Sequence, residues 1–455
     1  MFAADDTIVA IATPPGPGGI GVVRLSGPLS ARIANTVLRH AAPLEPRRAT
    51  VTEALDPDGG AVIDRVIATY FPCPASYTGE DVVEVSGHGN PVLLRQIVSA
   101  VIEAGARLAE PGEFTFRAYL NGRINLVQAE AVADLADAVT PRQARAAFDQ
   151  LEGTMTSVVE KIDQELFDLI SLLEASLDFP EEGYHFVDEE SVASETTGLS
   201  TKIFQLLASA DQGRLLREGC HVAIVGKPNV GKSTLFNTLC GVPRAIVTET
   251  AGTTRDLLTE KIDLGGIPIT LVDTAGIHKT QDPVEAEGID RAHRTITVAD
   301  AVIVVLDGSC PLEKKDRRIL EDTKNMRRLV IVSKADLPSA WLVESEPGIS
   351  DGDPVFEACL LSDNQTTLEG IRGRLISVLE NSSSKERRDI PAVTNLRHIT
   401  LLKKAQTALA RAASLATACA AEELVITDLQ EARSALEEIS GKRTPDAVIE
   451  RIFER

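Results

Sequence analysis

The sequence predicts a multidomain protein in which an α+β domain comes first and an α/β domain then interrupts an all-α domain. Its 455 residues exceed what one hydrophobic core supports, because cores stop growing near roughly 250–300 residues. The hydrophobic pattern also changes along the chain, from short runs to helical periodicity, then to alternating runs and back to helical periodicity. We therefore expect four segments, with the boundaries 1–122, 123–217, 218–382 and 383–455.

The first segment carries short apolar runs separated by glycine and proline. IVAIAT at 8–13, IGVVRLSG at 20–27 and VIDRVIATYF at 62–71 have the length of strands. The stretches between them leave room for helices, so residues 1–122 are expected to form a compact α+β domain.

Helical periodicity occurs on both sides of the central segment. Between about Gln128 and Leu216 apolar residues recur at intervals of three and four, and the same pattern returns after the polar stretch NSSSKERRD at 381–389. The economical interpretation is one helical domain divided by an insertion; two separate helical domains are the alternative. Within 218–382, strand-like and helix-like runs alternate, which indicates a mostly parallel sheet covered by helices.

The composition limits which cellular compartment and which binding partners we expect for this chain. The longest clean apolar run, Ala301–Leu306, is strand-sized, whereas a membrane span needs about 18 residues, and no signal peptide is expected. Six scattered cysteines favour reduced thiols and a cytoplasmic location. The net charge of −21 opposes non-specific binding to nucleic acid, so an RNA contact would need a local basic patch or a second protein.

A phosphate-binding loop is the strongest motif. Residues 226–233, GKPNVGKS, match G-x-x-x-x-G-K-[ST] between a strand-like run and a helix-like run. Backbone N–H groups would surround the phosphates, Lys232 would approach the β/γ-phosphates, and the Ser233 hydroxyl would ligate Mg²⁺. The predicted contacts are Asn229, Val230, Gly231, Lys232, Ser233 and Thr234.

Two further segments complete the phosphate side of the site. Asp273, in Asp-Thr-Ala-Gly, would reach the Mg²⁺ shell, and the Gly276 N–H would sense the γ-phosphate. In Gly-Thr-Thr-Arg, Thr254 offers a second hydroxyl to Mg²⁺. The predicted contacts here are Gly252, Thr253, Thr254, Asp273, Thr274, Ala275 and Gly276.

The base is predicted to be guanine. Ser333-Lys334-Ala335-Asp336 takes the place of the usual Asn-Lys-x-Asp, and the Asp336 carboxylate can accept hydrogen bonds from guanine N1–H and N2–H₂. Because Ser333 replaces Asn, we expect the loss of a base contact and of a tie to the phosphate loop, hence weakened affinity. Ser362 lies where a backbone N–H would contact the guanine O6.

These motifs predict a Ras-like P-loop G domain, with its site between residues 226 and 336, that holds Mg²⁺ and hydrolyses GTP. Many GTPases orient the attacking water with a Gln directly after Asp-x-x-Gly, but here that residue is Ile277. The catalytic polar group must therefore come from elsewhere.

The whole pattern resembles the MnmE (TrmE) family of GTPases, which help to modify the wobble uridine of certain tRNAs. The resemblance covers nearly the whole chain and is carried by stretches in all of its parts. Among them are DTIVAIATPPGPGGIGVVRLSG at 6–27, EPGEFTFRAYLNGRINLVQAEAVADL at 110–135, LDFPEE at 177–182 and GKPNVGKSTLFN at 226–237.

The resemblance implies how hydrolysis is assisted. It assigns a K⁺ site to Asn229 and to the loop around Thr248, Thr250 and Thr253, and that loop adds Glu249 and Ala251 to the nucleotide contacts. It assigns the role of orienting the water to Glu285; the alternative is a solvated glutamate at a helix start.

The resemblance also implies ligands and partners. Arg24, Glu84 and Arg123 match contacts to a tetrahydrofolate derivative, 5,10-methylene- or 5-formyl-tetrahydrofolate; isolated solvated charges are the alternative. The family dimerises through its N-terminal domain. It works with the flavoprotein MnmG, which holds FAD, in a heterotetramer that adds a carboxymethylaminomethyl or aminomethyl group to tRNA.

Two details leave alternatives open. Family members typically end in Phe-Cys-[Ile/Val]-Gly-Lys, whereas this sequence stops at Arg455, so it is either clipped or lacks that tail. A GTP-driven assembly switch and a ribosome-assembly GTPase are the competing functions.

His88 has no nucleophile or metal partner at a suitable spacing, so a structural role is expected.

Overall fold

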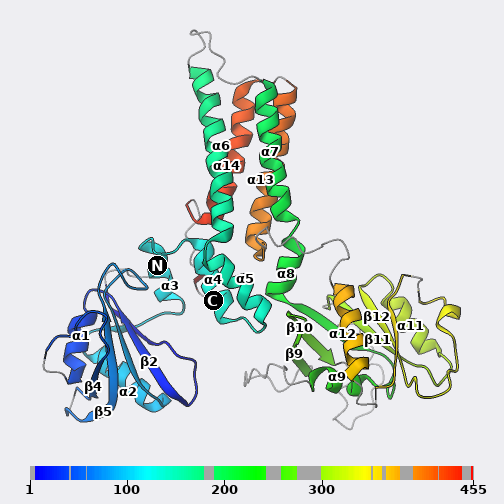
Figure 1. Cartoon of the computed structure of the whole chain (residues 1–455), viewed down its shortest axis with the longest axis horizontal. Helices are drawn as coiled ribbons and strands as arrows, with labels where there is room; N and C mark the ends of the chain where they lie inside the picture. The colour runs from blue at the N-terminus through cyan, green and yellow to red at the C-terminus, as the bar shows by residue number, and fades with distance from the viewer. Residues whose placement is uncertain are drawn as a thin grey trace. The chain divides into compact units, whose positions relative to one another are not determined.

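The computed structural model describes residues 6–39, 42–57, 59–178, 189–241, 258–273, 299–349, 352–360, 365–379, 393–418, 420–442 and 452–453. The chain divides into two compact units (Figure 1). The first contains Met1–Ala133, Leu151–Thr156 and Leu436–Arg455, and the second contains Asp134–Gln150 and Ser157–Ala435. Among the described helices, none is both long and apolar enough to cross a membrane.

A seven-stranded sheet organises the first unit, in the order β3-β4-β5-β6-β2-β1-β7. Its strands are β1 (Ile8–Ile11), β2 (Gly18–Ser26), β3 (Leu38–Arg39), β4 (Thr50–Leu55), β5 (Val62–Phe71), β6 (Val82–Gly89) and β7 (Arg107–Leu108). Neighbouring strands are antiparallel except β1 and β7, which are parallel. The mixture of strands and helices confirms the predicted α+β domain.

Two helices cover one face of this sheet. They are α1 (Ser30–Val37) and α2 (Pro91–Glu103), and α2 begins where the Asn90 side chain accepts a hydrogen bond from the Val92 N–H at 2.8 Å. Side chains of alternate strand positions, such as Val23 and Val85, pack with Ile97 of α2 in one core. The intervening positions, including Arg24 and Glu84, therefore lie on the opposite face.

A cluster of charged side chains ties α3 (Glu113–Leu120) to the first strand. Arg117 is 1% exposed and Glu113 is fully buried, with Nη2 of the arginine 3.0 Å from Oε1 of the glutamate. Arg107 also contacts Glu113, at 2.6 Å, and both arginines contact Asp6. Burial raises the pKa of Glu113, but hydrogen bonds from Arg107, from the Glu110 N–H and from Arg117 outweigh it, so the pKa lies below its usual value.

The end of the chain packs on the same unit. The Phe453 ring meets Phe116 edge-on at 5.1 Å and lies 5.9 Å from Tyr119, between ring centroids. A Cβ on Gly112, which has a φ of +71°, would come 2.0 Å from the Phe453 carbonyl oxygen, so only glycine fits there.

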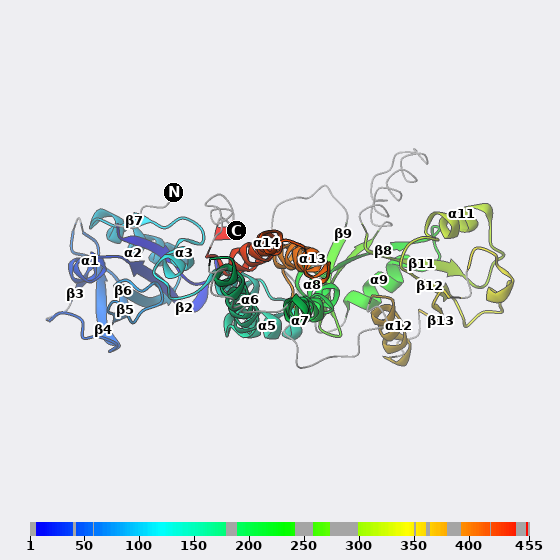
Figure 2. The same ribbon diagram turned by 90° about the horizontal axis from the view of Figure 1, so that it is seen from above.

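Long helices form part of the second unit. The helices that lie mainly in this unit are α5 (Pro141–Leu151), α6 (Thr154–Asp178), α7 (Glu189–Leu207), α8 (Ala210–Glu218), α13 (Leu396–Thr417) and α14 (Glu422–Ser440). The helix α4 (Leu126–Ala136) lies mainly in the first unit. Figures 1 and 2 show α6, α7, α13 and α14 side by side. Hydrogen bonds from Gln150 to Thr394, at 2.6 Å, and from Arg433 to Asp163, at 3.2 Å, join segments on either side of the α/β region.

The α/β region is a six-stranded sheet in the order β13-β12-β11-β8-β10-β9. Its strands are β8 (Cys220–Val225), β9 (Leu258–Leu264), β10 (Ile267–Asp273), β11 (Ala301–Asp307), β12 (Arg328–Ser333) and β13 (Val355–Ala358). All neighbours are parallel except β9 and β10. This confirms the mostly parallel sheet expected from the alternating runs.

Helices cover both faces of this sheet, which explains why its strands are continuous apolar runs. Figure 2 shows α9 (Lys232–Cys240) and α12 (Gln365–Leu379) on one side and α11 (Lys314–Asp322) on the other. Residues of β8 alternate between the two cores, because Ile224 packs with the α9 side and Val225 with the α11 side.

The turn between β9 and β10 contacts α5. Gly265 and Gly266 both have positive φ, as a two-residue hairpin turn requires, and the Thr140 hydroxyl donates to the Gly266 carbonyl at 2.7 Å. A Cβ on Gly266 would lie 2.1 Å from Cδ of Arg142, so the contact also requires glycine.

Replacing Arg117 by Met is expected to destabilise the first unit by about 3–5 kcal/mol, because it leaves the buried Glu113 with fewer cationic partners. The pKa of Glu113 is lower in the folded state than in the unfolded state, so the stabilisation is present above the usual glutamate value of 4.5. It is lost as the pH falls through the folded-state pKa. Urea unfolding of the wild type and of the variant at pH 7 and pH 4 measures both effects.

Arg48→Met is the matched control, because Arg48 pairs with Glu45 on the surface. It should leave the unfolding midpoint unchanged at both pH values. Equal midpoints for Arg117→Met and the wild type would contradict a stabilising role of the buried cluster.

Candidate functional site

The phosphate-binding loop follows β8 and leads into α9. Gly226, Asn229 and Gly231 have φ values of +155°, +65° and +105°, a sequence of turns that curls the backbone before the helix begins at Lys232. A Cβ on Gly226 would lie 2.4 Å from the Val305 carbonyl oxygen, so the loop can approach β11 only with glycine. The α9 N-terminus behind the loop favours an anionic ligand.

Lys232 lies against the loop that it serves. Its Nζ donates to the carbonyl oxygens of Gly226, at 2.8 Å, and Lys227, at 2.6 Å, and the residue is 7% exposed. The ammonium therefore sits within the curl of the loop. Ser233 is exposed and Thr234 is half-buried in the first turn of α9, and Asn229 is exposed at the loop tip.

Ser333 retains a tie to the phosphate loop, contrary to the sequence-based expectation. Its hydroxyl lies 2.6 Å from the Val230 carbonyl oxygen and 3.0 Å from the Leu306 carbonyl oxygen, and it can donate to one of them at a time. The expectation assumed that only the longer Asn amide could reach the loop. Here the Val230 carbonyl comes close enough for a side chain as short as serine.

The lysine of the base motif is held by an aspartate that the sequence analysis missed. Lys334 Nζ lies 2.5 Å from Oδ2 of Asp307, the last residue of β11. Burial raises the pKa of Asp307, but hydrogen bonds from Lys334 and Ser309 outweigh it and lower the pKa overall. The Trp341 indole N–H donates to the Asp307 carbonyl oxygen at 3.0 Å. The feature of the sequence that could have revealed Asp307 is an acidic residue at the end of a buried apolar strand.

The sheet brings these residues together because its parallel strands end at one edge. The loop follows β8, Asp273 ends β10, and Asp307 pairs in register with Ser333 at the ends of β11 and β12. Asp336, just beyond β12, is exposed. Other predicted residues lie outside the described part of the chain: Thr248, Glu249, Thr250, Ala251, Gly252, Thr253, Thr254, Thr274, Ala275, Gly276, Ile277, Glu285 and Ser362.

In the first unit, two of the three predicted folate residues contact one another. Arg24 and Glu84 are register partners on β2 and β6, and Nη2 of the arginine lies 2.7 Å from Oε1 of the glutamate. The guanidinium also lies 5.4 Å from the Tyr77 ring centroid and 5.8 Å from that of Phe114. A ligand would meet Arg24 and Glu84 as one pair rather than as separate charges.

The third predicted residue, Arg123, is exposed and lies beside the loop that carries Tyr77. A Cβ on Gly79, which has a φ of +80°, would come within 3.2 Å of its Cγ. Gly79 therefore allows the Arg123 side chain to lie against the 76–80 loop.

His88 has a partner that the sequence did not reveal. Its Nδ1 lies 2.8 Å from Oδ1 of Asp64, and its backbone N–H donates to Oδ2 of the same carboxylate at 2.8 Å. A Cβ on Gly87 would come 2.6 Å from that carboxylate. Asp64 is buried and fixes the end of β6, which agrees with the structural role expected for His88.

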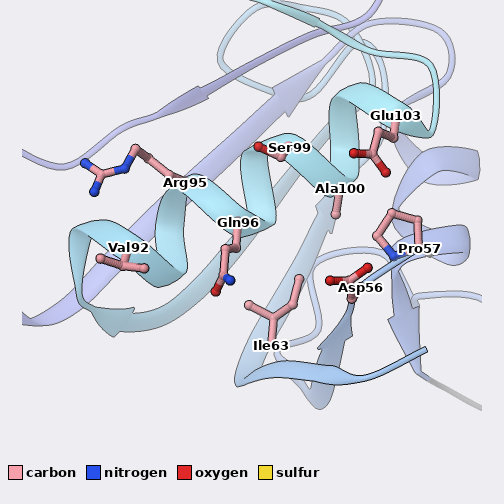
Figure 3. A pocket seen from close by; sticks show the side chains of 9 residues that line it. All are labelled: Asp56, Pro57, Ile63, Val92, Arg95, Gln96, Ser99, Ala100 and Glu103. Carbon is pink, nitrogen blue, oxygen red and sulfur yellow. The ribbon is translucent and has the colours of Figure 1, made fainter. Parts of the chain in front are cut away.

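Figure 3 shows a groove in the first unit, with a volume of about 270 Å³, whose lining includes none of the residues predicted for the folate site. It lies between α2 and the turn that joins β4 to β5. Its lining residues are Asp56, Pro57, Ile63, Val92, Arg95, Gln96, Ser99, Ala100 and Glu103.

A P-loop before a helix, a base-binding motif after β12 and a mostly parallel sheet together define a GTP-binding protein of the P-loop class. Comparison with known proteins narrows the class. Residues 126–455 match the family model of the MnmE helical domain, and residues 7–123 match that of the N-terminus of the GTP-binding protein TrmE.

Curated relatives match this chain over nearly their whole length. The tRNA modification GTPase MnmE of Lactiplantibacillus plantarum is 38% identical over 98% of this chain and 97% of its own. The protein of the same name from Syntrophotalea carbinolica is 40% identical over 99% of this chain and 98% of its own. Among solved structures, the G domain of the T. maritima FeoB iron transporter is 24% identical, covers 35% of this chain and 98% of its own, and has a TM-score of 0.25. The chain belongs to the MnmE family of tRNA modification GTPases.

Ser333→Ala is expected to weaken GDP binding about fivefold, because the hydrogen bond to Val230 is lost and a net hydrogen bond contributes roughly 1 kcal/mol. Titration with a fluorescent GDP analogue measures the change. In the wild type, GTP should displace the analogue and ATP should not.

Ser345→Ala removes an exposed hydroxyl that donates to the Leu342 carbonyl, and it serves as the control with unchanged affinity. If Ser333→Ala binds GDP as tightly as the wild type, the tie to Val230 has no role in nucleotide binding.

Proposed function

We propose that this GTPase hydrolyses GTP with the help of K⁺ and, together with a flavoprotein of the MnmG type, adds a carboxymethylaminomethyl or aminomethyl group to C5 of the wobble uridine of certain tRNAs. The observation that carries the proposal is the arrangement of Lys232, Ser333 and Asp336 at one sheet edge. It occurs in a chain that matches tRNA modification GTPases along 97–98% of their length.

The organisation that we propose has an N-terminal domain at 1–122, a helical domain at 123–217 and 383–455, and a G domain at 218–382 inserted into it. Contacts across the insertion support this division, because Gln150 bonds to Thr394 and α7 packs along α13. We further propose a homodimer formed through the N-terminal domain and a cytoplasmic location.

Guanine recognition in this proposal depends on Asp336. The carboxylate accepts hydrogen bonds from two guanine N–H groups, which adenine does not offer in that pattern. Lys334, held by Asp307, fixes the chain direction before Asp336, and its φ of +58° turns the backbone there.

In this proposal, the groups that assist hydrolysis do not include a Gln directly after Asp-x-x-Gly, the usual position of the water-orienting side chain. Lys232 approaches the β/γ-phosphates, and Ser233 at the start of α9 would ligate Mg²⁺ together with Thr254. Exposed Asn229, whose φ is +65°, offers its side-chain oxygen to K⁺, which when bound neutralises charge on the transferring phosphate. Glu285 orients the water.

Glu285→Ala should bind GTP normally and lose most of its turnover, because this proposal assigns the phosphate and base contacts to other residues. Phosphate release in K⁺ buffer and in Na⁺ buffer, with GDP affinity measured in parallel, separates the two requirements. Wild-type turnover in the variant would refute the role of Glu285, and equal turnover in both buffers would refute that of K⁺.

The same variant tests the link to tRNA. Nucleosides from cells that lack this protein should lack the modified wobble uridines, and restored wild-type protein should return them. If Glu285→Ala also restores them fully, GTP hydrolysis is not part of the modification, and an assembly switch explains the domain better.

We also propose that the pair Arg24 and Glu84, with Arg123, binds a tetrahydrofolate derivative. Arg24 meets Oε1 of Glu84, so the other carboxylate oxygen, Oε2, would offer an acceptor to pterin N–H groups, and Arg123 beside the 76–80 loop would offer a cation to the glutamate tail. The flat Tyr77 and Phe114 rings beside Arg24 favour a planar ligand.

Arg123→Gln should weaken binding of 5-formyl-tetrahydrofolate about tenfold in equilibrium dialysis, because a charge-assisted contact to the tail is lost. Arg32→Gln, on the exposed side of α1, is the control. Unchanged binding by Arg123→Gln, with GDP affinity intact, would remove Arg123 from the folate site.

A further inference from the structure

The second residue of the phosphate loop is joined to a helix that no motif includes. Lys227 Nζ lies 2.7 Å from Oδ2 of Asp316 and 3.4 Å from Oε2 of Glu313, both at the start of α11. The Lys227 side chain is 19% exposed and that of Asp316 is 1% exposed. This pair is therefore shielded from solvent, unlike most surface ion pairs.

Asp316 is held rigidly where it meets the loop. Its Oδ2 also accepts a hydrogen bond from the Glu313 N–H at 2.9 Å, and the two residues form a reciprocal cap of α11. The helix N-terminus favours a carboxylate at this position. Hydrogen bonding to Asp316 raises the pKa of Lys227, so the ammonium stays charged near neutral pH.

The backbone of Lys227 completes a connection to the phosphates. Its carbonyl oxygen accepts a hydrogen bond from Lys232 Nζ at 2.6 Å. The side chain of residue 227 is thus fixed by α11, while its carbonyl fixes the lysine that serves the β/γ-phosphates. Further along the loop, the Val230 carbonyl is held by Ser333.

We propose that Asp316 and Lys227 are positioning residues for GTP, which hold the start of the phosphate loop so that Lys232 meets the β- and γ-phosphates. The pair acts on the phosphate end of the site, as Ser333 does through Val230, and leaves the base end to Asp336. The proposal depends on the GTP site alone and is independent of K⁺, Glu285, folate and tRNA chemistry.

Full-length Lys227→Met and Asp316→Asn should each weaken GDP and GTP binding about tenfold, the change that loss of one shielded charge-assisted contact produces. GMP, which has no β-phosphate, should bind with the wild-type affinity, so the ratio of GMP to GDP dissociation constants should fall about tenfold. Competition against a fluorescent GDP analogue gives all three affinities. Lys227→Arg keeps the cation and should recover most of the loss.

The double variant Lys227→Met/Asp316→Asn should be no weaker than the worse single variant, because both changes break the same contact. Arg318→Met, which breaks an exposed pair with Asp322 on the same helix, should leave every affinity unchanged. Equal weakening of GMP and GDP, or losses that add in the double variant, would show a general structural role and overturn the proposal. Wild-type GDP affinity in both single variants would overturn it as well.

Discussion

The nucleotide site depends on one constraint: a loop that offers its N–H groups to phosphates cannot use those groups to hold itself in place. The protein meets this constraint by binding the loop through its carbonyl groups. The Gly226 and Lys227 carbonyls accept from Lys232, and the Val230 carbonyl accepts from Ser333. The donors of these bonds come from α9 and β12, so the protein's own side chains hold the loop in its shape.

The same constraint explains why β11 and β12 matter to a site that follows β8. Because β11 and β12 end in register, Asp307 and Ser333 lie side by side, one holding Lys334 and the other the loop. In the proposed mode of GTP binding, Asp307 and Ser333 therefore act through Lys334 and the loop. Such groups raise affinity by reducing the ordering that binding would otherwise require.

The sequence was sufficient to predict the parts of the structure that follow from local residue patterns. The alternating runs predicted the parallel sheet, and GKPNVGKS predicted the loop and the helix at Lys232, because each depends on neighbouring residues. Pairings between distant residues could not be predicted. The spacing of Arg24 and Glu84 does not show that β2 and β6 are neighbours, and nothing near Ser333 shows how close the Val230 carbonyl comes. The contact of Phe453 with Phe116 is of the same kind, since most of the chain separates the two residues in sequence.

The indole of Trp341 has a practical consequence. It is the only tryptophan in the sequence, and its N–H donates to the same Asp307 whose carboxylate holds Lys334. The indole therefore lies beside the base-binding end of the proposed site. In the proposed mode of binding, its fluorescence should change when a base arrives, so nucleotide exchange could be followed on the unmodified chain.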